Sequence, residues 1–193
     1  MIAIIKYNAG NIKSVENALQ RLGYPCVVTD DAQTLKEADK VIFPGVGAAK
    51  PAMKYLRERK LDQVILNLTQ PVLGICLGLQ LMCSESEEGA TKCLGIFKNK
   101  VRRFEEKELV PHMGWNSITH LKGPLFEDIK NNKDTYFVHS YYAELSAQTS
   151  AICLYDIPFS ASLQKDNFYA TQFHPEKSAG LGEKILKNFL ALW

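Results

Sequence analysis

The sequence predicts an α/β fold, with a mostly parallel central sheet and antiparallel strands added in the C-terminal half. In the first half, short apolar runs alternate with helical patterns, which is typical of βαβ units. The second half instead holds short strand patterns separated by turn residues. The chain of 193 residues is 46% hydrophobic and 23% charged, which suits a single globular domain over residues 1–193.

The first half is expected to alternate strands and helices. The strands are expected at residues 2–7, 24–29, 40–43 and 71–76, as short apolar or β-branched runs. The helices are expected at residues 11–22, 48–59 and 61–68, with a further apolar helix starting at Leu77. In the first of these helices, Ile12, Val15 and Leu19 recur at helical spacing, and Gly23 follows as a C-terminal cap.

The second half is expected to be largely antiparallel. Short strands are expected at residues 101–104, 115–119, 136–144, 151–157, 160–164 and 168–173. A closing helix at residues 180–193 places Leu181, Ile185 and Phe189 on one face. Together these patterns indicate an α/β sheet with an added antiparallel β layer.

Charge and cysteine content argue against several classes of protein. The net charge of +2 gives no electrostatic footprint for nucleic acid, and no apolar run is long enough to span a membrane. The N-terminus resembles a strand rather than a signal peptide, and the odd count of five cysteines suggests reduced thiols, so we expect a cytoplasmic protein. The four histidines are scattered and no Cys-x-x-Cys pair occurs, so no metal site is expected.

A cysteine between two glycines gives the sharpest signal for chemistry. Residues 74–78 read Gly-Ile-Cys-Leu-Gly, at the end of an apolar strand and the start of an apolar helix. This is the cysteine form of a nucleophile elbow, a tight turn on which glycines keep other side chains away from the nucleophile. The N-terminus of the following helix favours a thiolate. The alternative is a buried cysteine beside incidental glycines.

A histidine and a carboxylate follow late in the chain. His174 and Glu176 flank Pro175. A cysteine nucleophile needs a base that takes its proton and returns it to the leaving amine, and that base needs an orienting group. Because proline interrupts regular structure, both side chains can point the same way from a loop. The alternative is a surface histidine beside a glutamate that starts a helix.

A glycine-rich turn follows the third expected strand. Residues 44–47 read Pro-Gly-Val-Gly, and backbone N–H groups of Val46 and Gly47, with that of Leu77, are candidates for an oxyanion hole. Glycines on both sides of Val46 let its peptides rotate at little steric cost, so that the loop could present either an N–H or a carbonyl. The alternative is an ordinary turn between a strand and a helix.

Together these residues resemble a known enzyme family. Residues 74–78 with Gln80, followed by His174-Pro175-Glu176, are similar to the triad-type (class I) glutamine amidotransferases. The resemblance implies that Cys76 is the nucleophile, His174 the base and Glu176 its orienting group. It also implies a flavodoxin-like three-layer fold, hydrolysis of glutamine to glutamate and ammonia through a thioester, and no cofactor.

Four further segments narrow the resemblance to the glutaminase subunits of imidazole glycerol phosphate synthase, of histidine biosynthesis. They are Gly-Asn-Ile-x-Ser-Val from residue 10, Pro-Gly-Val-Gly from residue 44, Pro-His-Met-Gly-Trp-Asn from residue 111 and Tyr-Phe-Val-His-Ser-Tyr from residue 136. The resemblance covers essentially the whole chain. Lys6-Tyr7-Asn8 departs from the usual Asp-Tyr-Gly, at a strand end rather than in the triad.

The resemblance also implies a partner and further site residues. The ammonia would pass to a (β/α)8 barrel cyclase subunit, in a heterodimer, to make imidazole glycerol phosphate and an aminoimidazole carboxamide ribonucleotide. The backbone of His139, Ser140 and Tyr141, together with Gln80, would hold the glutamine α-amino and carboxylate groups. The residues expected toward the partner are Asn11, Met113, Trp115, Asn116, Tyr136 and Lys177.

From the residues alone, alternatives remain. Trp115 could pack into the core, residues 136–141 could be a plain strand, and Lys177 could be simply solvated. The rival functions are another class I amidotransferase, a cysteine-elbow hydrolase, and a non-catalytic module with the same fold. A glutamine analogue that fails to label Cys76 would favour the hydrolase.

Overall fold

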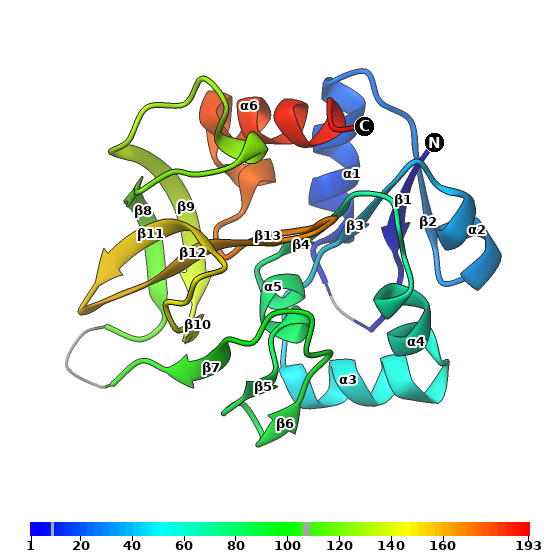
Figure 1. Ribbon diagram of the computed structural model, residues 1–193, viewed down its shortest axis with the longest axis horizontal. Coiled ribbons are helices and arrows are strands. Elements are labelled where there is room, and N and C mark those ends of the chain that lie inside the picture. Colours follow the sequence, from blue (N-terminus) through cyan, green and yellow to red (C-terminus); the bar gives the residue numbers. More distant parts are fainter. Residues whose placement is uncertain (9, 106–108) are drawn as a thin grey trace.

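The computed structural model describes residues 1–8, 10–105 and 109–193, and in them a nine-stranded sheet dominates (Figure 1). The strand order is β2-β1-β3-β4-β13-β12-β11-β8-β9. The bounds are β1 (Ile2–Ile5), β2 (Cys26–Thr29), β3 (Lys40–Phe43), β4 (Val72–Ile75), β8 (His112–Thr119), β9 (Lys133–His139), β11 (Thr149–Tyr155), β12 (Ile157–Lys165) and β13 (Phe168–Thr171). A smaller sheet has the order β10 (Tyr141–Ala143), β7 (Lys100–Arg103), β5 (Glu85–Ser86) and β6 (Thr91–Lys92).

Helices cover both faces of the large sheet. They are α1 (Ile12–Arg21), α2 (Ala32–Glu37), α3 (Ala49–Glu58), α4 (Leu61–Leu66), α5 (Leu77–Met82) and α6 (Ala179–Leu190), with the 3-10 turns η1 (Pro124–Phe126) and η2 (Pro175–Lys177). Helices α1 and α6 lie on one face, and α3, α4 and α5 on the other (Figure 1). Because side chains alternate along a strand, Ala3 and Ile5 enter the core beneath α3–α5, whereas Ile2 and Ile4 enter the core beneath α1 and α6.

The sheet changes direction halfway across. Strand β1 pairs in parallel with β2 and β3, β3 with β4, and β4 with β13. Strands β12, β11, β8 and β9 then continue the same sheet in antiparallel fashion. The predicted α/β class, with antiparallel strands added in the C-terminal half, is confirmed. The antiparallel strands extend the central sheet itself, and the four-stranded sheet is the separate addition.

A few local features differ from the sequence expectation. Helix α2 is short, and its start is set by the Asp31 carboxylate, which accepts from the Thr34 N–H at 2.7 Å. Strands β5 and β6 have two residues each, too few for an alternating pattern. The single strand expected at residues 136–144 is two strands, because the chain bends at Ser140 and β10 pairs with β7 instead.

The strand order decides where a site can form. Strands β3, β4 and β13 are parallel neighbours, so their carboxyl ends meet at one edge of the sheet. Residues 44–47 follow β3, Cys76 follows β4, and His174 follows β13. Strand β9 also reaches this edge, because the His174 N–H donates to the Tyr136 carbonyl at 2.9 Å. Four segments far apart in the sequence therefore converge there.

Candidate active site

Cys76 stands at a sharp turn between β4 and α5. Its backbone has φ 54° and ψ −105°, a strained conformation for a residue that carries a side chain. A Cβ at position 78 would lie 1.9 Å from the Phe43 carbonyl oxygen, and a Cβ at Gly74 would lie 3.0 Å from the backbone of Gly78. The Gly-x-Cys-x-Gly pattern therefore reflects a steric requirement of the elbow.

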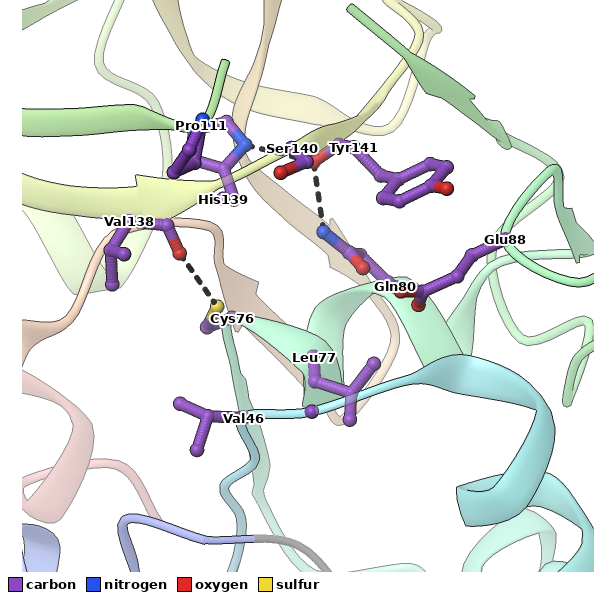
Figure 2. Close-up of a pocket in the computed structure, with 11 residues that line it drawn as sticks. Val46, Cys76, Leu77, Gln80, Glu88, Pro111, Val138, His139, Ser140 and Tyr141 are labelled. Carbon is purple, nitrogen blue, oxygen red and sulfur yellow. Dashed lines mark hydrogen bonds between the residues drawn. The ribbon is translucent and has the colours of Figure 1, made fainter.

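The Cys76 thiol lies at a pocket of about 310 Å³ (Figure 2). Its Sγ lies 3.8 Å from the Val138 carbonyl oxygen and 3.7 Å from the Gln172 amide nitrogen. The pocket is lined by Val46, Gly47, Cys76, Leu77, Gln80, Glu88, Pro111, Val138, His139, Ser140 and Tyr141. The structure thus brings together every residue that the sequence analysis assigns to the oxyanion hole and to substrate binding.

His174 and Glu176 form a buried pair at the same edge. His174 Nδ1 and Glu176 Oε1 are 2.8 Å apart, and both side chains are fully enclosed. Because an ionised carboxylate only accepts hydrogen bonds, Nδ1 carries the hydrogen, which leaves Nε2 for proton transfer. Within the described part of the chain, Nε2 is buried and has no hydrogen-bond partner.

Partners rather than burial decide the charge of His174. Burial by itself lowers the pKa of this imidazole, but Cys76 and Glu176 outweigh burial and raise the pKa to about 10. A second proton is therefore favoured on the ring, beside Cys76 and Glu176. From that position it can be given to a leaving amine.

Asn11, expected at the partner contact, touches this pair. Its side-chain amide donates to Glu176 Oε1 and lies 3.3 Å from His174 Nδ1. Asn11 precedes α1 in a left-handed conformation (φ 72°), which asparagine tolerates better than most residues. This contact cannot be predicted from the sequence, because no spacing relates the start of α1 to the loop after β13.

The loop at residues 44–47 turns a carbonyl toward the elbow. The Leu77 N–H, expected as an oxyanion donor, donates to the Gly45 carbonyl oxygen at 3.2 Å. Because a trans peptide points its C=O and N–H in opposite directions, the Val46 N–H points away from Leu77. The expected use of these two N–H groups is therefore not realised in this conformation. A rotation of the Gly45–Val46 peptide would free the Leu77 N–H and turn the Val46 N–H toward the elbow.

Tyr7 clamps the start of this loop. Its buried hydroxyl donates to the Pro44 carbonyl at 2.7 Å, and a Cβ at Gly45 would lie 2.0 Å from that hydroxyl. Tyr7 is the central residue of the segment Lys6-Tyr7-Asn8, and only its neighbours depart from the family pattern. The departure therefore leaves the clamp intact.

The wall opposite the elbow is the junction of β9 and β10. The Tyr141 carbonyl oxygen accepts from Gln80 Nε2 at 2.9 Å and lies 2.8 Å from His139 Nδ1 (Figure 2). Gln80 Nε2 also donates to the Gln172 side-chain oxygen at 3.0 Å. The Tyr141 carbonyl at this bend is therefore held by one side chain from helix α5 and one from strand β9.

Glu88 is a pocket residue that the sequence analysis misses. Its Oε2 accepts from the Ala49 N–H at 2.7 Å, at the start of α3. It lies between the two-residue strands β5 and β6, where the sequence has no periodic signal. Its carboxylate places negative charge at the pocket, which favours a ligand with an ammonium group.

The residues expected toward a partner are mostly accessible. Met113 and Trp115 are 63% and 55% exposed. The Trp115 and Tyr136 rings meet edge to face across β8 and β9 at 6.0 Å, and Lys177 Nζ lies 6.0 Å from the Tyr136 ring. Trp115 is therefore not a core residue, and an exposed Trp and Met on one strand are typical of an interface.

The other cysteines show no sign of chemistry. Cys83, Cys93 and Cys153 are buried, and burial raises the pKa of each thiol. Over residues 1–8, 10–105 and 109–193, no cluster of side chains could hold a metal ion. In the same residues, no helix has the length and apolarity needed to cross a bilayer.

Comparisons with known proteins agree with this arrangement. The glutamine amidotransferase class-I family matches residues 3–193. The chain is 59% identical to the imidazole glycerol phosphate synthase subunit HisH of Bacteroides fragilis, over 99% of both chains. It is 48% identical to the HisH subunit of Haemophilus influenzae, over 98% of this chain and 96% of that one.

A solved structure supports the fold. The chain superposes on a putative GMP synthase protein from Thermoplasma acidophilum with a TM-score of 0.75. The match covers 98% of this chain and 92% of that one at 18% sequence identity. At this identity the likeness concerns the fold alone.

Proposed function

Since the chain belongs to the class-I glutamine amidotransferases, and within them to the HisH subunits of imidazole glycerol phosphate synthase, we propose that it hydrolyses glutamine at Cys76. It is the glutaminase subunit of that synthase and serves histidine biosynthesis. The observation that carries the assignment of the site is the Cys76 elbow beside the buried pair of His174 and Glu176. In this pair, His174 Nδ1 and Glu176 Oε1 are 2.8 Å apart. We take residues 1–193 to act as one domain.

The first step forms a thioester. The Cys76 sulfur attacks the carboxamide carbon of glutamine, and the carbonyl oxygen becomes an oxyanion. The proton on His174 Nε2 passes to the leaving nitrogen, which departs as ammonia, and Glu176 holds the imidazole through Nδ1. In the second step His174 takes a proton from water as the water oxygen attacks the thioester carbon, and the carbon–sulfur bond breaks to release glutamate and return Cys76. No cofactor enters either step.

Substrate binding is assigned to the wall opposite the elbow. The backbone at Ser140 and Tyr141, beside Gln80, lies where it can hold the α-carboxylate end of glutamine. The Glu88 carboxylate at the same pocket suits the α-ammonium group. A substrate with both charged groups would then place its carboxamide toward Cys76.

The partner subunit is assigned to the face around Met113, Trp115 and Tyr136, with Asn11, Asn116 and Lys177 beside it. The partner is a (β/α)8 barrel cyclase that forms a heterodimer with this chain in the cytoplasm and receives the ammonia. The exposed Trp and Met support this assignment, because such side chains are enriched in interface cores. Lys177, which is exposed, can pair with a carboxylate of the partner.

The test is reconstitution with the cyclase subunit. The chain should co-purify with it, and glutamine hydrolysis should be measured with and without the nucleotide acceptor. Acceptor-stimulated release of glutamate that disappears in Cys76→Ala supports the proposal. Glutamine turnover with a purine or chorismate synthase partner, and none with the cyclase, would assign the chain to another amidotransferase.

A further inference from the structure

Two buried histidines outside the triad face each other across the antiparallel pair β8–β9. His112 and His139 are opposite residues in the register, and they are 3% and 6% exposed. His112 Nδ1 lies 3.0 Å from His139 Nε2, and the His112 ring stacks on Tyr155 with centroids 3.9 Å apart. Nothing in the catalytic steps uses either ring.

The pocket end of this pair determines which nitrogens carry hydrogen. His139 Nδ1 lies 2.8 Å from the Tyr141 carbonyl oxygen, which can only accept, so Nδ1 must be protonated (Figure 2). In a neutral ring, His139 Nε2 is then an acceptor, and His112 Nδ1 must donate to it. His112 Nε2 is left as an acceptor, 3.3 Å from the side-chain nitrogen of Asn116.

The other end determines the same direction independently. The Asn116 side-chain oxygen accepts from the Ser117 N–H at 2.8 Å, and its nitrogen donates to the Leu154 carbonyl at 3.0 Å. The amide therefore presents its nitrogen, a donor, to His112. Both ends give one sequence of donors, from Asn116 through His112 and His139 to Tyr141.

Both rings are held in the neutral form that this direction requires. Burial lowers the pKa of His112 to about 4 and that of His139 to about 3. A second proton on His112 would set an N–H against the Asn116 amide, and a second proton on His139 would set one against His112 Nδ1–H. Charging either ring therefore breaks one link.

This chain of hydrogen bonds ends at the bend at Ser140, which lines the pocket. The His139 side chain reaches over Ser140 to the carbonyl of Tyr141, while the Ser140 carbonyl accepts from the Phe104 N–H at 3.1 Å. The same Tyr141 oxygen accepts from Gln80, so that both of its lone pairs are used. The orientation of the backbone at this bend depends on the donor supplied by His139.

We propose that His112 and His139 are positioning residues, which form with Asn116 a one-directional hydrogen-bond chain that holds the Ser140–Tyr141 bend in the shape that binds glutamine. The role in glutamine binding rests on the proposed function. This hydrogen-bond chain raises the affinity for glutamine and leaves the chemistry at Cys76 unchanged.

The direction of the chain can be tested without any activity. Neutral histidine in water favours the hydrogen on Nε2, whereas the chain requires it on Nδ1 of both rings. Long-range proton–nitrogen correlation spectra of the ¹⁵N-labelled full chain at neutral pH should show both His112 and His139 as Nδ1–H tautomers. The loss of one signal in His112→Asn assigns the pair, and free histidine in the same buffer serves as the solvent reference. An Nε2–H tautomer or a doubly protonated ring at position 112 or 139 would contradict the proposed hydrogen-bond chain.

Its role in binding is tested by two variants at position 112, in the complex with the cyclase. His112→Phe keeps an aromatic ring against Tyr155 but removes the donor to His139, whereas the amide of His112→Asn can still donate there. We expect KM for glutamine to rise about tenfold in His112→Phe, the effect of one misplaced hydrogen bond, with kcat changed less than about twofold. His112→Asn should restore most of the affinity although it loses the ring packing and unfolds more easily.

A merely structural role predicts the opposite order. If KM follows stability, with His112→Asn worse than His112→Phe, or if KM is unchanged in His112→Phe, the positioning role is wrong. His120→Asn, on the surface, is the matched control and should leave both constants unchanged. A wild-type complex without glutaminase activity would instead refute the proposed function, and the tautomer spectra would still decide whether the chain exists.

Discussion

Two buried histidines on either side of the pocket are in opposite electrostatic states, and of the two only His139 lines the pocket itself. On the elbow side, His174 interacts with Cys76 and pairs with Glu176, and its pKa is raised to about 10. On the opposite wall, His139 has another imidazole and a backbone carbonyl as partners, and burial lowers its pKa to about 3. Both rings are buried, so burial cannot explain the difference. The partners decide it: anionic neighbours retain a proton, and neutral partners require a fixed tautomer.

This difference assigns different work to the two walls. A ring that gains and loses a proton serves bond breaking, whereas a ring that stays neutral serves to hold a backbone in place. Variants of the elbow wall should therefore lower kcat, and variants of the opposite wall should raise KM. The following experiments test that separation, in order of decreasing effect.

The largest effect is expected from the nucleophile. Cys76→Ala should abolish glutamine-dependent synthesis by the complex and leave synthesis from added ammonium salts intact, because the thiol serves only ammonia production. Both reactions are measured by formation of imidazole glycerol phosphate. Cys83→Ala, at a buried position directly after α5, is the matched control and should retain glutaminase activity. Loss of both reactions in Cys76→Ala would make Cys76 a structural residue.

The base and its orienting group come next. His174→Ala should lower the rate of thioester formation by about 10⁴, the upper range for general acid–base catalysis. Glu176→Gln should cost less, about 10²-fold. The Asn11 side-chain nitrogen would donate to the oxygen of the new glutamine and keep that oxygen turned toward His174 Nδ1, which preserves the tautomer. Trapping of the thioester by rapid quench measures both. Equal and small effects from the two variants would remove this pair from the catalytic machinery.

An effect smaller than that of His174→Ala is expected from the loop at residues 44–47. In the isolated chain the Gly45 carbonyl occupies the Leu77 N–H, so the chain should bind glutamine but hydrolyse it slowly. The rate should be lower than in the liganded complex by about two to three powers of ten, the typical cost of a missing oxyanion donor. The cyclase with its nucleotide should restore kcat far more than it lowers KM. Val46→Pro, which removes the N–H that would turn toward the oxyanion, should abolish that stimulation. A free chain as fast as the liganded complex would refute the switch.

The smallest effect concerns charge alone. In Cys76→Ala, the pKa of His174 should fall from about 10, because the interaction with Cys76 that raises it is gone while burial remains. His139 should stay neutral down to the acid range in both proteins. The raised pKa of His174 stabilises the folded state below pH 6.5, and this stabilisation is lost as the pH rises toward 10. In Cys76→Ala the free energy of unfolding should therefore fall less steeply with pH in the alkaline range. The acid limb, to which His112 and His139 contribute as pH falls below 6.5, should not change. NMR titration of the histidine rings and urea unfolding across pH measure these effects.

Much of the fold follows from short-range patterns. The strand at Lys40–Phe43 has the bounds expected from the sequence, and α1 and α3 differ by only one residue at each end. These segments carry enough apolar residues at a regular spacing to define their type. Helix α2 buries only Leu35, and strands β5 and β6 have two residues each, so none of them shows such a pattern. The break at Ser140 depends on pairing with β7, which lies far away in the chain.

The sequence by itself determined most element types and the strand-to-helix elbow, because these depend on residues close together in the chain. The candidate triad was predicted from two motifs far apart in the chain and from the family that they resemble. Gly74 and Gly78 are needed by local sterics at the elbow, whatever surrounds it. Only the tertiary structure decided that Asn11 contacts Glu176, that Glu88 lines the pocket, and that His112 and His139 form a chain with one direction. It also decided which way the Gly45 peptide points. Each of these depends on where strands from distant parts of the chain meet, and on which hydrogen-bond partners burial leaves available, and no local pattern encodes either.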